Sequence, residues 1–153
     1  MSFAKVKAYF ESQQLADKLF RLPASGATVA EAAETLDILP EQVAKTLAFK
    51  VNGQPLVVVM AGDARIDNHN FKSEFGARPR MIPADQVNGL IGHEVGGVCP
   101  FALNSGVDVY IDQSLENDPE VFPAAGDQFH AARLTLPELL SLSHYQRWVK
   151  VTK

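Results

Sequence analysis

The amino-acid sequence predicts an α+β fold, with helices towards both ends of the chain and strands in the middle. Two patterns lead to this prediction. Thr-x-x-Glu, a pairing that satisfies the first turn of a helix, precedes apolar helical segments at Thr28 and at Thr135. Between them, Asn52-Gly53 separates two β-rich runs, which is the strongest short-range signal for a hairpin. Because the chain has 153 residues, 46% of them hydrophobic, residues 1–153 are expected to form a single domain.

Before the hairpin, the chain is expected to form helical segments and one short strand. Ser2 can cap a first helix, which ends between residues 13 and 15, since apolar residues recur there near helical spacing. Residues 18–22 alternate and predict a short strand. An Ala-rich helix follows over Val29–Leu36, and a proline then opens a helical turn over residues 41–44.

The hairpin is expected to lie at the centre of the fold. Its strands are residues 45–51 and 55–61, and the second is apolar without alternation, as in a strand that is buried on both faces. A helix over residues 67–75 and an edge strand over residues 78–82 are expected next. A further helix begins at residue 83 and ends at one of two glycines.

The last third of the chain is predicted to return from strands to helix. Residues 107–112 alternate between apolar and charged side chains, and residues 120–123 and 128–134 are two further candidate strands. The second Thr-x-x-Glu pairing then starts a helix that extends through Leu142. The tail, residues 145–153, is amphipathic and is expected to pack its tryptophan against the rest of the domain.

Composition narrows the classes of function. The net charge of −4 argues against a dedicated DNA-binding protein, whose footprint is usually basic, although a local basic patch stays possible. No apolar run approaches the roughly 20 residues of a membrane span. The N-terminus lacks the order of a signal peptide, and the single cysteine excludes an intrachain disulfide. A cytoplasmic protein without a membrane segment is therefore expected.

The loop Gly92–Phe101 and Lys45 are the first candidates for a functional site. Three glycines and Pro100 can make the loop stiff, with N–H groups that hold an ester or carboxyl oxygen. The alternative is a connection that only needs tight turns. Lys45 stands where a helical turn becomes a strand and could neutralise a phosphate or an oxyanion. The alternative for Lys45 is a side chain that reaches to the surface.

Cysteine and metal chemistry receive little support from the spacing. Cys99 could act as a nucleophile only beside a histidine, and the histidines are scattered along the chain, so that a buried structural cysteine is the favoured interpretation. No HxxxH, HxH or CxxC spacing occurs, and no metal is predicted. A phosphate-binding loop of the Walker type is also missing from the sequence.

Several segments together resemble one family. They are Thr28–Ala33, Val43-Ala44-Lys45-Thr46-Leu47, the hairpin with Val57-Val58-Val59, the loop Gly92–Phe101, and Val109–Asp112. In this order they resemble the YbaK and prolyl-tRNA synthetase-associated editing domains, from about Ser12 to Leu142. The combination of Ala-Lys-Thr-Leu with Gly-Gly-Val-x-Pro-Phe is specific, whereas either block alone is weak.

The resemblance implies a mixed, barrel-like β-sheet surrounded by helices. It also implies an aminoacyl-tRNA deacylase, which hydrolyses the ester of a mischarged tRNA without metal or cofactor. Its catalytic residues would be Lys45, Gly96 and Gly97, and the ammonium of Lys45 is expected to face the main-chain donors of the glycine loop across a small cleft. Its contacts with the 3′ end of the aminoacyl-tRNA would be Gly92, Val98, Cys99, Pro100, Phe101, Asp112 and His130. Cys99 and Ala102 depart from many relatives, which leaves the amino acid unassigned.

A free-standing chain of this kind would act in trans on released aminoacyl-tRNA. One alternative is a non-catalytic binding module for a tRNA 3′ end, a small molecule or a partner enzyme. Another is a cysteine hydrolase that uses Cys99. The sequence assigns neither the preferred tRNA nor the oligomeric state, for which a monomer and a homodimer both stay open.

Overall fold

The structure, a computed structural model, describes residues 2–153. Its helices are α1 (Ser2–Ser12), α2 (Val29–Leu36), α3 (Asn68–Phe75), α4 (Ala84–Ile91) and α5 (Leu136–Ser143), with 3₁₀ turns η1 (Ala16–Lys18), η2 (Pro40–Gln42) and η3 (Gln113–Leu115). Its strands are β1 (Leu19–Arg21), β2 (Val43–Val51), β3 (Gln54–Ala61), β4 (Asp108–Asp112), β5 (Glu120–Pro123), β6 (His130–Ala132), β7 (Leu134–Thr135) and β8 (Trp148–Val149).

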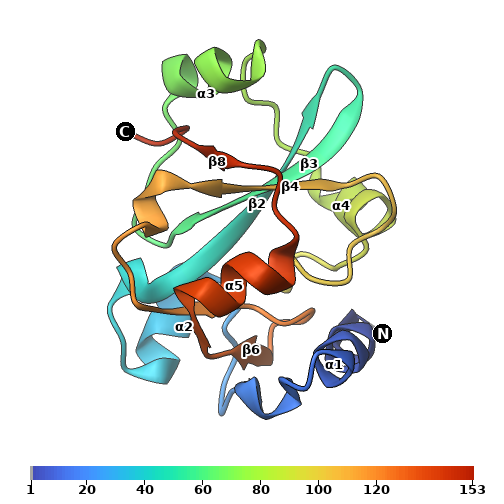
Figure 1. Cartoon of the computed structure of the whole chain (residues 1–153), viewed down its shortest axis with the longest axis vertical. Helices are drawn as coiled ribbons and strands as arrows, with labels where there is room; N and C mark the ends of the chain where they lie inside the picture. The colour runs from blue at the N-terminus through green and yellow to red at the C-terminus, as the bar shows by residue number, and fades with distance from the viewer. Residues whose placement is uncertain (1) are drawn as a thin grey trace.

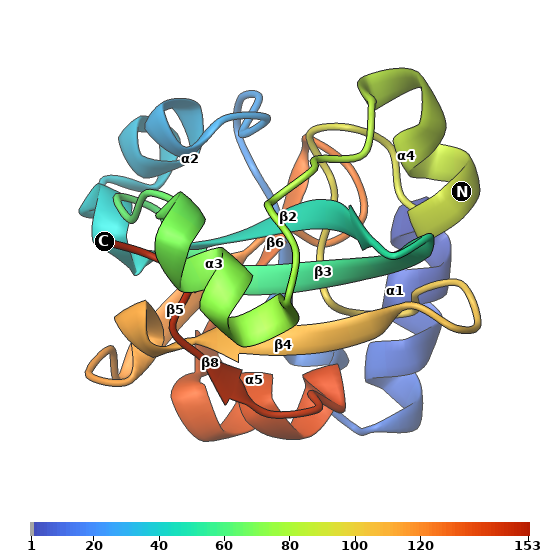
Figure 2. The same cartoon turned by 90° about the horizontal axis from the view of Figure 1, so that it is seen from above.

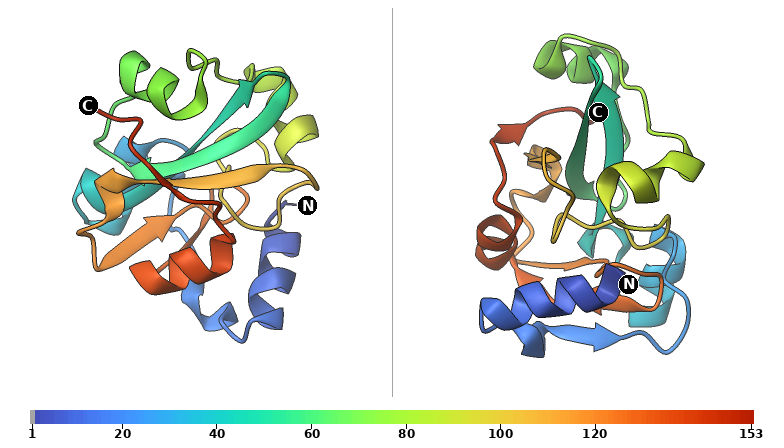
Figure 3. Two further views of the ribbon diagram at one scale, coloured as in Figure 1. Left: turned by 45° about the horizontal axis from the view of Figure 1, so that its top comes forward. Right: turned by 90° about the vertical axis from the view of Figure 1, so that its right-hand side faces the viewer.

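The strands form a mixed sheet and a small antiparallel sheet. The mixed sheet has the order β7-β5-β2-β3-β4-β8, in which β2 and β3 are the antiparallel hairpin and β4 and β5 run parallel to their hairpin neighbours. The small sheet pairs β1 with β6. Figure 1 shows the hairpin and β4 crossing the centre of the molecule, with α3 on one side and α2, α5 and β6 on the other. Figure 3 shows α1 beside the small sheet.

The central strand β3 separates two clusters of buried side chains. Val57 and Val59 face the larger core, to which α1, α4 and α5 also contribute. Val58 and Met60 face a smaller core, which Phe71 of α3 closes, and Figure 2 shows α3 lying over this face of the hairpin. The prediction of a strand buried on both faces is thus confirmed, since six of its eight residues are buried.

Local signals placed most elements correctly. Asn52 and Gly53 both have positive φ, at 50° and 81°, as a tight hairpin turn requires. Thr28 accepts a hydrogen bond from the N–H of Glu31 and caps α2. At α5, Thr135 and Glu138 form the reciprocal pair that the sequence predicts. Each of these signals acts within a few residues, so distant parts of the chain do not override it.

The structure corrects several predictions in detail. Glu31 does not close the pairing at Thr28, because its carboxylate accepts a hydrogen bond from the hydroxyl of Ser25 instead. Residues 78–82 form no strand, and only a single bridge joins Met81 to Phe49. The expected strand over residues 128–134 is divided into β6 and β7, which pair with different partners.

The end of the chain also differs from a simple amphipathic tail. It contributes β8, which pairs with β4, and it continues past the buried carboxylate of Asp112. None of the helices within residues 2–153 has both the length and the apolar character needed to span a membrane.

Candidate functional site

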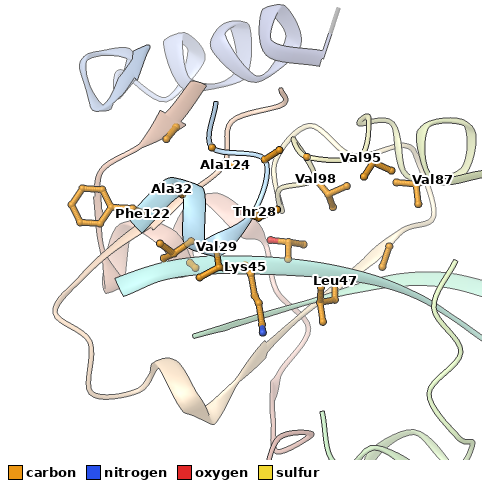
Figure 4. A pocket seen from close by; sticks show the side chains of 18 of the residues that line it. Thr28, Val29, Ala32, Lys45, Leu47, Val87, Val95, Val98, Phe122 and Ala124 are labelled. Atoms are coloured by element: carbon orange, nitrogen blue, oxygen red, sulfur yellow. The ribbon is translucent and has the colours of Figure 1, made fainter. Parts of the chain in front are cut away.

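A cavity of about 550 Å³ opens between α2, the edge of β2 and the loop that follows α4. This volume lies within the range typical of small-molecule sites. Figure 4 shows Val29 and Ala32 of α2 on one side and Val95 and Val98 of the loop on the other. The lining is largely apolar and comprises Leu22, Gly26, Ala27, Thr28, Val29, Ala32, Leu36, Val43, Ala44, Lys45, Thr46, Leu47, Ala48, Met81, Ile82, Ala84, Val87, Val95, Gly96, Val98, Phe122, Ala124, His130 and Ala131.

The cavity exists because one edge of β2 is left uncovered. β5 pairs with β2 only at Val43 and Ala44. Farther along, the N–H of Ile82 donates to the carbonyl of Ala48 at 3.0 Å, so the main-chain groups of Ala48 point to the same edge. Main-chain groups of strand residues two apart point to the same side. The N–H and C=O of Thr46 therefore face the cavity, between the two covered stretches.

Thr46 also brings a polar side chain into this apolar space. The side chain lies on the face of β2 that carries Ala44 and Ala48, and the residue is only 8% exposed. Its hydroxyl has no hydrogen-bond partner in the described part of the chain. A buried polar group without a partner costs about 1–3 kcal/mol. The hydroxyl is therefore unpaired and sealed from solvent, in a residue that lines the cavity.

Lys45 leaves β2 on the opposite face. Its Nζ donates to the carbonyl of Ala64 at 2.6 Å. Burial lowers the pKa of Lys45, with a smaller opposing effect of the Asp63 carboxylate and a smaller lowering by Arg65. Figure 4 shows the side chain pointing away from Val95 and Val98. Lys45 thus contributes to the rim at the open edge, but the expected arrangement, with its ammonium facing the glycine loop, is not present.

The glycine loop meets the cavity at Gly96 and Val98. Gly96 has φ of +92°, which L side chains rarely adopt, and the N–H groups of Gly96 and Val98 have no acceptor among residues 2–153. Both are thus free to donate to a ligand. Gly97 lies behind them, where a β-carbon would come within 2.4 Å of the main chain of Asp127. A glycine is needed at this position because the main chain packs directly against the segment that precedes β6.

Some of the other residues predicted to contact the substrate line the cavity, and the rest lie outside it. His130 lies in the cavity lining. The lining does not include Gly92, Cys99, Pro100, Phe101 or Asp112. Gly92 ends α4 with φ of +101°, while Cys99 and Phe101 are fully buried in the larger core.

Asp112 has a structural role in the fold. Its carboxylate accepts hydrogen bonds from the N–H groups of Ser114 and Val151 and from the hydroxyl of Thr152. These bonds join the end of β4 to the C-terminal segment. The carboxylate is fully buried, and these three donors give it hydrogen-bond partners there.

Cys99 and His93 are in contact, although their spacing does not suggest a pair. The Sγ of Cys99 lies 3.4 Å from the Nε2 of His93, which is also 2.6 Å from the carbonyl oxygen of Phe101. Burial raises the pKa of the Cys99 thiol to about 12, and the side chain has no exposed surface. The thiol is therefore neutral and sealed, which contradicts the interpretation as a cysteine hydrolase.

Metal ligation is not supported by the arrangement of side chains. Across residues 2–153, no three His, Cys, Asp or Glu side chains gather in a way that could hold a metal ion. The polar groups available at the cavity are main-chain donors, the hydroxyls of Thr28 and Thr46, the ammonium of Lys45 at the rim and the imidazole of His130.

Comparison with known sequences assigns the family. A sequence model described as "Aminoacyl-tRNA editing domain" matches residues 24–142. The chain belongs to this family. The resemblance found in the sequence is thus confirmed, and the editing-domain match contains every cavity-lining residue except Leu22.

Relatives of this editing domain include both short proteins and synthetases. "Uncharacterized protein YwhH" of Bacillus subtilis is 39% identical over 154 residues, which cover 100% of this chain and 98% of YwhH. "Proline--tRNA ligase" of Bacillus cytotoxicus is 30% identical over 88 residues, which cover 57% of this chain and 16% of the ligase.

Solved structures share the fold. The crystal structure of a "putative trans-editing enzyme for prolyl tRNA synthetase" matches with a TM-score of 0.88 and 29% identity, over 99% of this chain and 97% of that one. The hypothetical protein APE2540 matches with a TM-score of 0.87 and 28% identity, over 97% and 99% of the two chains. The predicted fold, a mixed, barrel-like sheet surrounded by helices, is confirmed.

Sequence reasoning missed several residues of the cavity. Thr46 was visible as the neighbour of Lys45, and strand alternation could have placed the two on opposite faces. Val29, Ala32 and Leu36 recur at helical spacing on α2 and line one wall. Helical periodicity predicts that such residues share a face, but it does not show that the face borders a cavity.

Proposed function

We propose that this chain is an aminoacyl-tRNA deacylase that acts in trans, as a single editing domain, on the ester of a mischarged tRNA. The observation that carries the proposal is the coincidence of the family match with the cavity. The stretch that matches the editing domain supplies nearly the whole lining. A trans-acting role is further supported by the structural relative that is described as a "putative trans-editing enzyme for prolyl tRNA synthetase".

The cavity offers what ester hydrolysis requires. An aminoacyl ester is already activated, so the site mainly has to hold the carbonyl and admit water. The free N–H groups of Gly96 and Val98 are suited to hold the oxyanion that forms, and removing one such donor typically costs about 3 kcal/mol of barrier. A rotation of the buried Thr46 side chain would bring its unpaired hydroxyl to the ammonium group or the ribose of the substrate.

The apolar lining favours an uncharged amino acid side chain. Alanine and valine side chains make up much of the wall around the open edge of β2. Such a wall discriminates by size, and one methylene is worth roughly 1–3 kcal/mol. The match to part of proline-tRNA ligases makes tRNA for proline, mischarged with a smaller amino acid, the first substrate to test.

A deacylation screen tests the proposal. Purified protein is incubated with tRNAs that carry alanine, serine, threonine or cysteine, and with correctly charged prolyl-tRNA. We expect rapid hydrolysis of at least one mischarged species and no hydrolysis of prolyl-tRNA. Tight binding of all these species without hydrolysis of any would contradict catalysis and favour the binding module.

A further inference from the structure

His93 closes the loop Gly92–Phe101 through a contact of its side chain. Its Nε2 lies 2.6 Å from the carbonyl oxygen of Phe101, eight residues farther along the chain. Both residues are fully buried, and neither belongs to the lining of the cavity. The contact therefore joins the two ends of the loop inside the protein, away from the space that receives the substrate.

The contact with Phe101 fixes where the ring carries its hydrogen. Because a carbonyl oxygen only accepts hydrogen bonds, Nε2 of the neutral ring must be the N–H group, and Nδ1 is then an acceptor. Nδ1 is sealed from solvent and has no partner among residues 2–153. A second proton on the ring would therefore create a buried, charged N–H group without an acceptor, which costs far more than an unpaired neutral nitrogen.

The surroundings of the ring also disfavour a second proton. Burial lowers the pKa of His93, opposed by the hydrogen bond to Phe101 and aided by the ammonium of Lys5. The titratable side chains on the segments that pack around the ring are Lys5 of α1, the buried Cys99, the exposed Glu94, and Asp127, which is bound to His130. None of these carboxylates is engaged with the His93 ring, so the closed loop holds that ring in its neutral form.

Closure of the loop bears on the part that faces the cavity. The tip carries the free N–H groups of Gly96 and Val98. Between them, the N–H of Gly97 donates within the loop at 3.0 Å, and its carbonyl accepts from the N–H of Gly126 at 3.1 Å. These bonds hold one residue of the tip, whereas the contact made by His93 keeps the two sides of the loop together.

We propose that His93 is a positioning residue for deacylation, an inference that rests on the proposed function. Its neutral ring, bound to the Phe101 carbonyl, holds the loop in the form in which the N–H groups of Gly96 and Val98 face the cavity. A proton on Nδ1 is accommodated only when the loop opens and water reaches the ring. Protonation of His93 and opening of the loop are therefore linked.

Two substitutions separate the hydrogen bond from the packing of the ring. His93→Gln keeps an N–H donor at nearly the position of Nε2 and has no group that titrates near neutral pH. His93→Leu fills a similar volume without a donor and leaves the Phe101 carbonyl unpaired. His69→Gln, at an exposed histidine of α3, is the matched control.

The first readout is deacylation at pH 7.5, with circular dichroism as the check on folding. Loss of an oxyanion donor typically costs about 10²- to 10³-fold in kcat, so we expect kcat of His93→Leu to fall at least about 100-fold while KM changes less than about threefold. His93→Gln and His69→Gln should both keep kcat within about threefold of the wild type. A folded His93→Leu with wild-type kcat would overturn the inference, and so would a His93→Gln that loses as much as His93→Leu.

The second readout is amide hydrogen exchange, which tests the link without any substrate. The N–H groups of Gly97 and Gly126 report opening of the loop, and that of Val58, in the central strand β3, reports unfolding of the whole domain. Because the ordinary pKa of histidine is about 6.5, a pH one unit below it favours the open, protonated form by about tenfold.

Exchange is expressed relative to that of an unfolded chain at the same pH. We expect exchange at Gly97 and Gly126 to accelerate about tenfold in the wild type between pH 7.5 and pH 5.5, to stay faster than at Val58, and to remain constant in His93→Gln. Exchange at the rate of Val58, or an acceleration that persists in His93→Gln, would overturn the inference. A wild-type protein with the expected exchange but without any deacylation would overturn the proposed function and leave the link between His93 and the loop in place.

Discussion

Lys45 and Thr46 are neighbours in sequence, yet they lie on opposite faces of β2. The ammonium of Lys45 binds the Ala64 carbonyl, whereas the hydroxyl of Thr46 has no partner in the structure as described and borders the cavity. Side chains of a strand alternate between faces, so only one of the two can be directed at the cavity. In the sequence, the charged Lys45 is the more conspicuous candidate. In the structure, the uncharged Thr46 is the one whose side chain lies on the cavity face of β2.

The unpaired hydroxyl of Thr46 leads to a prediction about stability. Removing the hydroxyl should change the free energy of unfolding in opposite directions at Thr46 and at the buried Thr152. Thr46→Val removes an unpaired polar group, so we expect the free energy of unfolding to rise by about 1 kcal/mol while deacylation falls about tenfold. Thr152→Val removes the hydroxyl that Asp112 accepts from and should lower stability by about 1–3 kcal/mol. Urea unfolding and deacylation rates measure both. A loss of stability in Thr46→Val would show that the hydroxyl is already satisfied.

The position of Lys45 on the rim leads to a prediction about binding. We propose that its half-buried ammonium, which donates to the Ala64 carbonyl, also holds a phosphate of the tRNA rather than the reacting carbonyl. We expect Lys45→Ala to raise KM about tenfold and to weaken its salt dependence, with kcat changed less than about threefold. Steady-state kinetics at two salt concentrations measure this. A large fall in kcat at constant KM would instead support the catalytic role that the family resemblance implies.

At the scale of elements, the cavity wall depends on two loops that touch through glycine. A β-carbon at Gly97 would lie 2.4 Å from main-chain atoms of Gly126 and Asp127, so Gly97→Ala should destabilise the protein by about 1–3 kcal/mol. Gly89 is the matched control, since it lies inside α4 with open space around it. Gly89→Ala should stabilise by about 0.5–1 kcal/mol. Equal effects of the two substitutions, measured by urea unfolding, would contradict the packing described for Gly97.

How far a structural feature depends on distant residues decides whether the sequence could predict it. The capping threonines of α2 and α5 and the turn at Asn52 depend on contacts within a few residues, and they were predicted correctly, whereas the reciprocal contact of Glu31 was not. The open edge of β2 depends on where β5 stops pairing with it, some 80 residues farther along the chain. Contacts of this range leave no local pattern. The contact of Cys99 with His93 was missed for a related reason, since the irregular loop between them has no fixed period.

For the whole molecule, His93 predicts how stability depends on pH. Burial lowers the pKa of His93 below its ordinary value of 6.5, aided by Lys5 and opposed by the Phe101 carbonyl. The unfolded chain therefore takes up this proton at higher pH than the folded protein does. The stability is fully present above pH 6.5 and is lost as the pH falls towards the lowered pKa.

Urea unfolding between pH 7.5 and pH 5.5, a window of about one unit on each side of the ordinary histidine value, measures this effect. His69→Asn, at an exposed histidine, should follow the wild-type curve. His93→Gln should be less stable than the wild type at every pH. Its stability should also fall much less than that of the wild type as the pH decreases. A wild-type stability that stays constant through this range would contradict a buried, neutral His93.

The central claim is that hydrolysis takes place in the cavity at the open edge of β2, and filling that cavity tests it most directly. Ala32 of α2 lines the cavity, whereas Ala30 is exposed on the same helix. Single-turnover deacylation of alanyl-tRNA for proline is compared for Ala32→Phe, Ala30→Phe and the wild-type protein, with urea unfolding as the check on folding. We expect Ala32→Phe to lose activity by at least about 100-fold, since the substrate has no room, and Ala30→Phe to match the wild type. A folded Ala32→Phe variant with wild-type activity would place the reaction elsewhere.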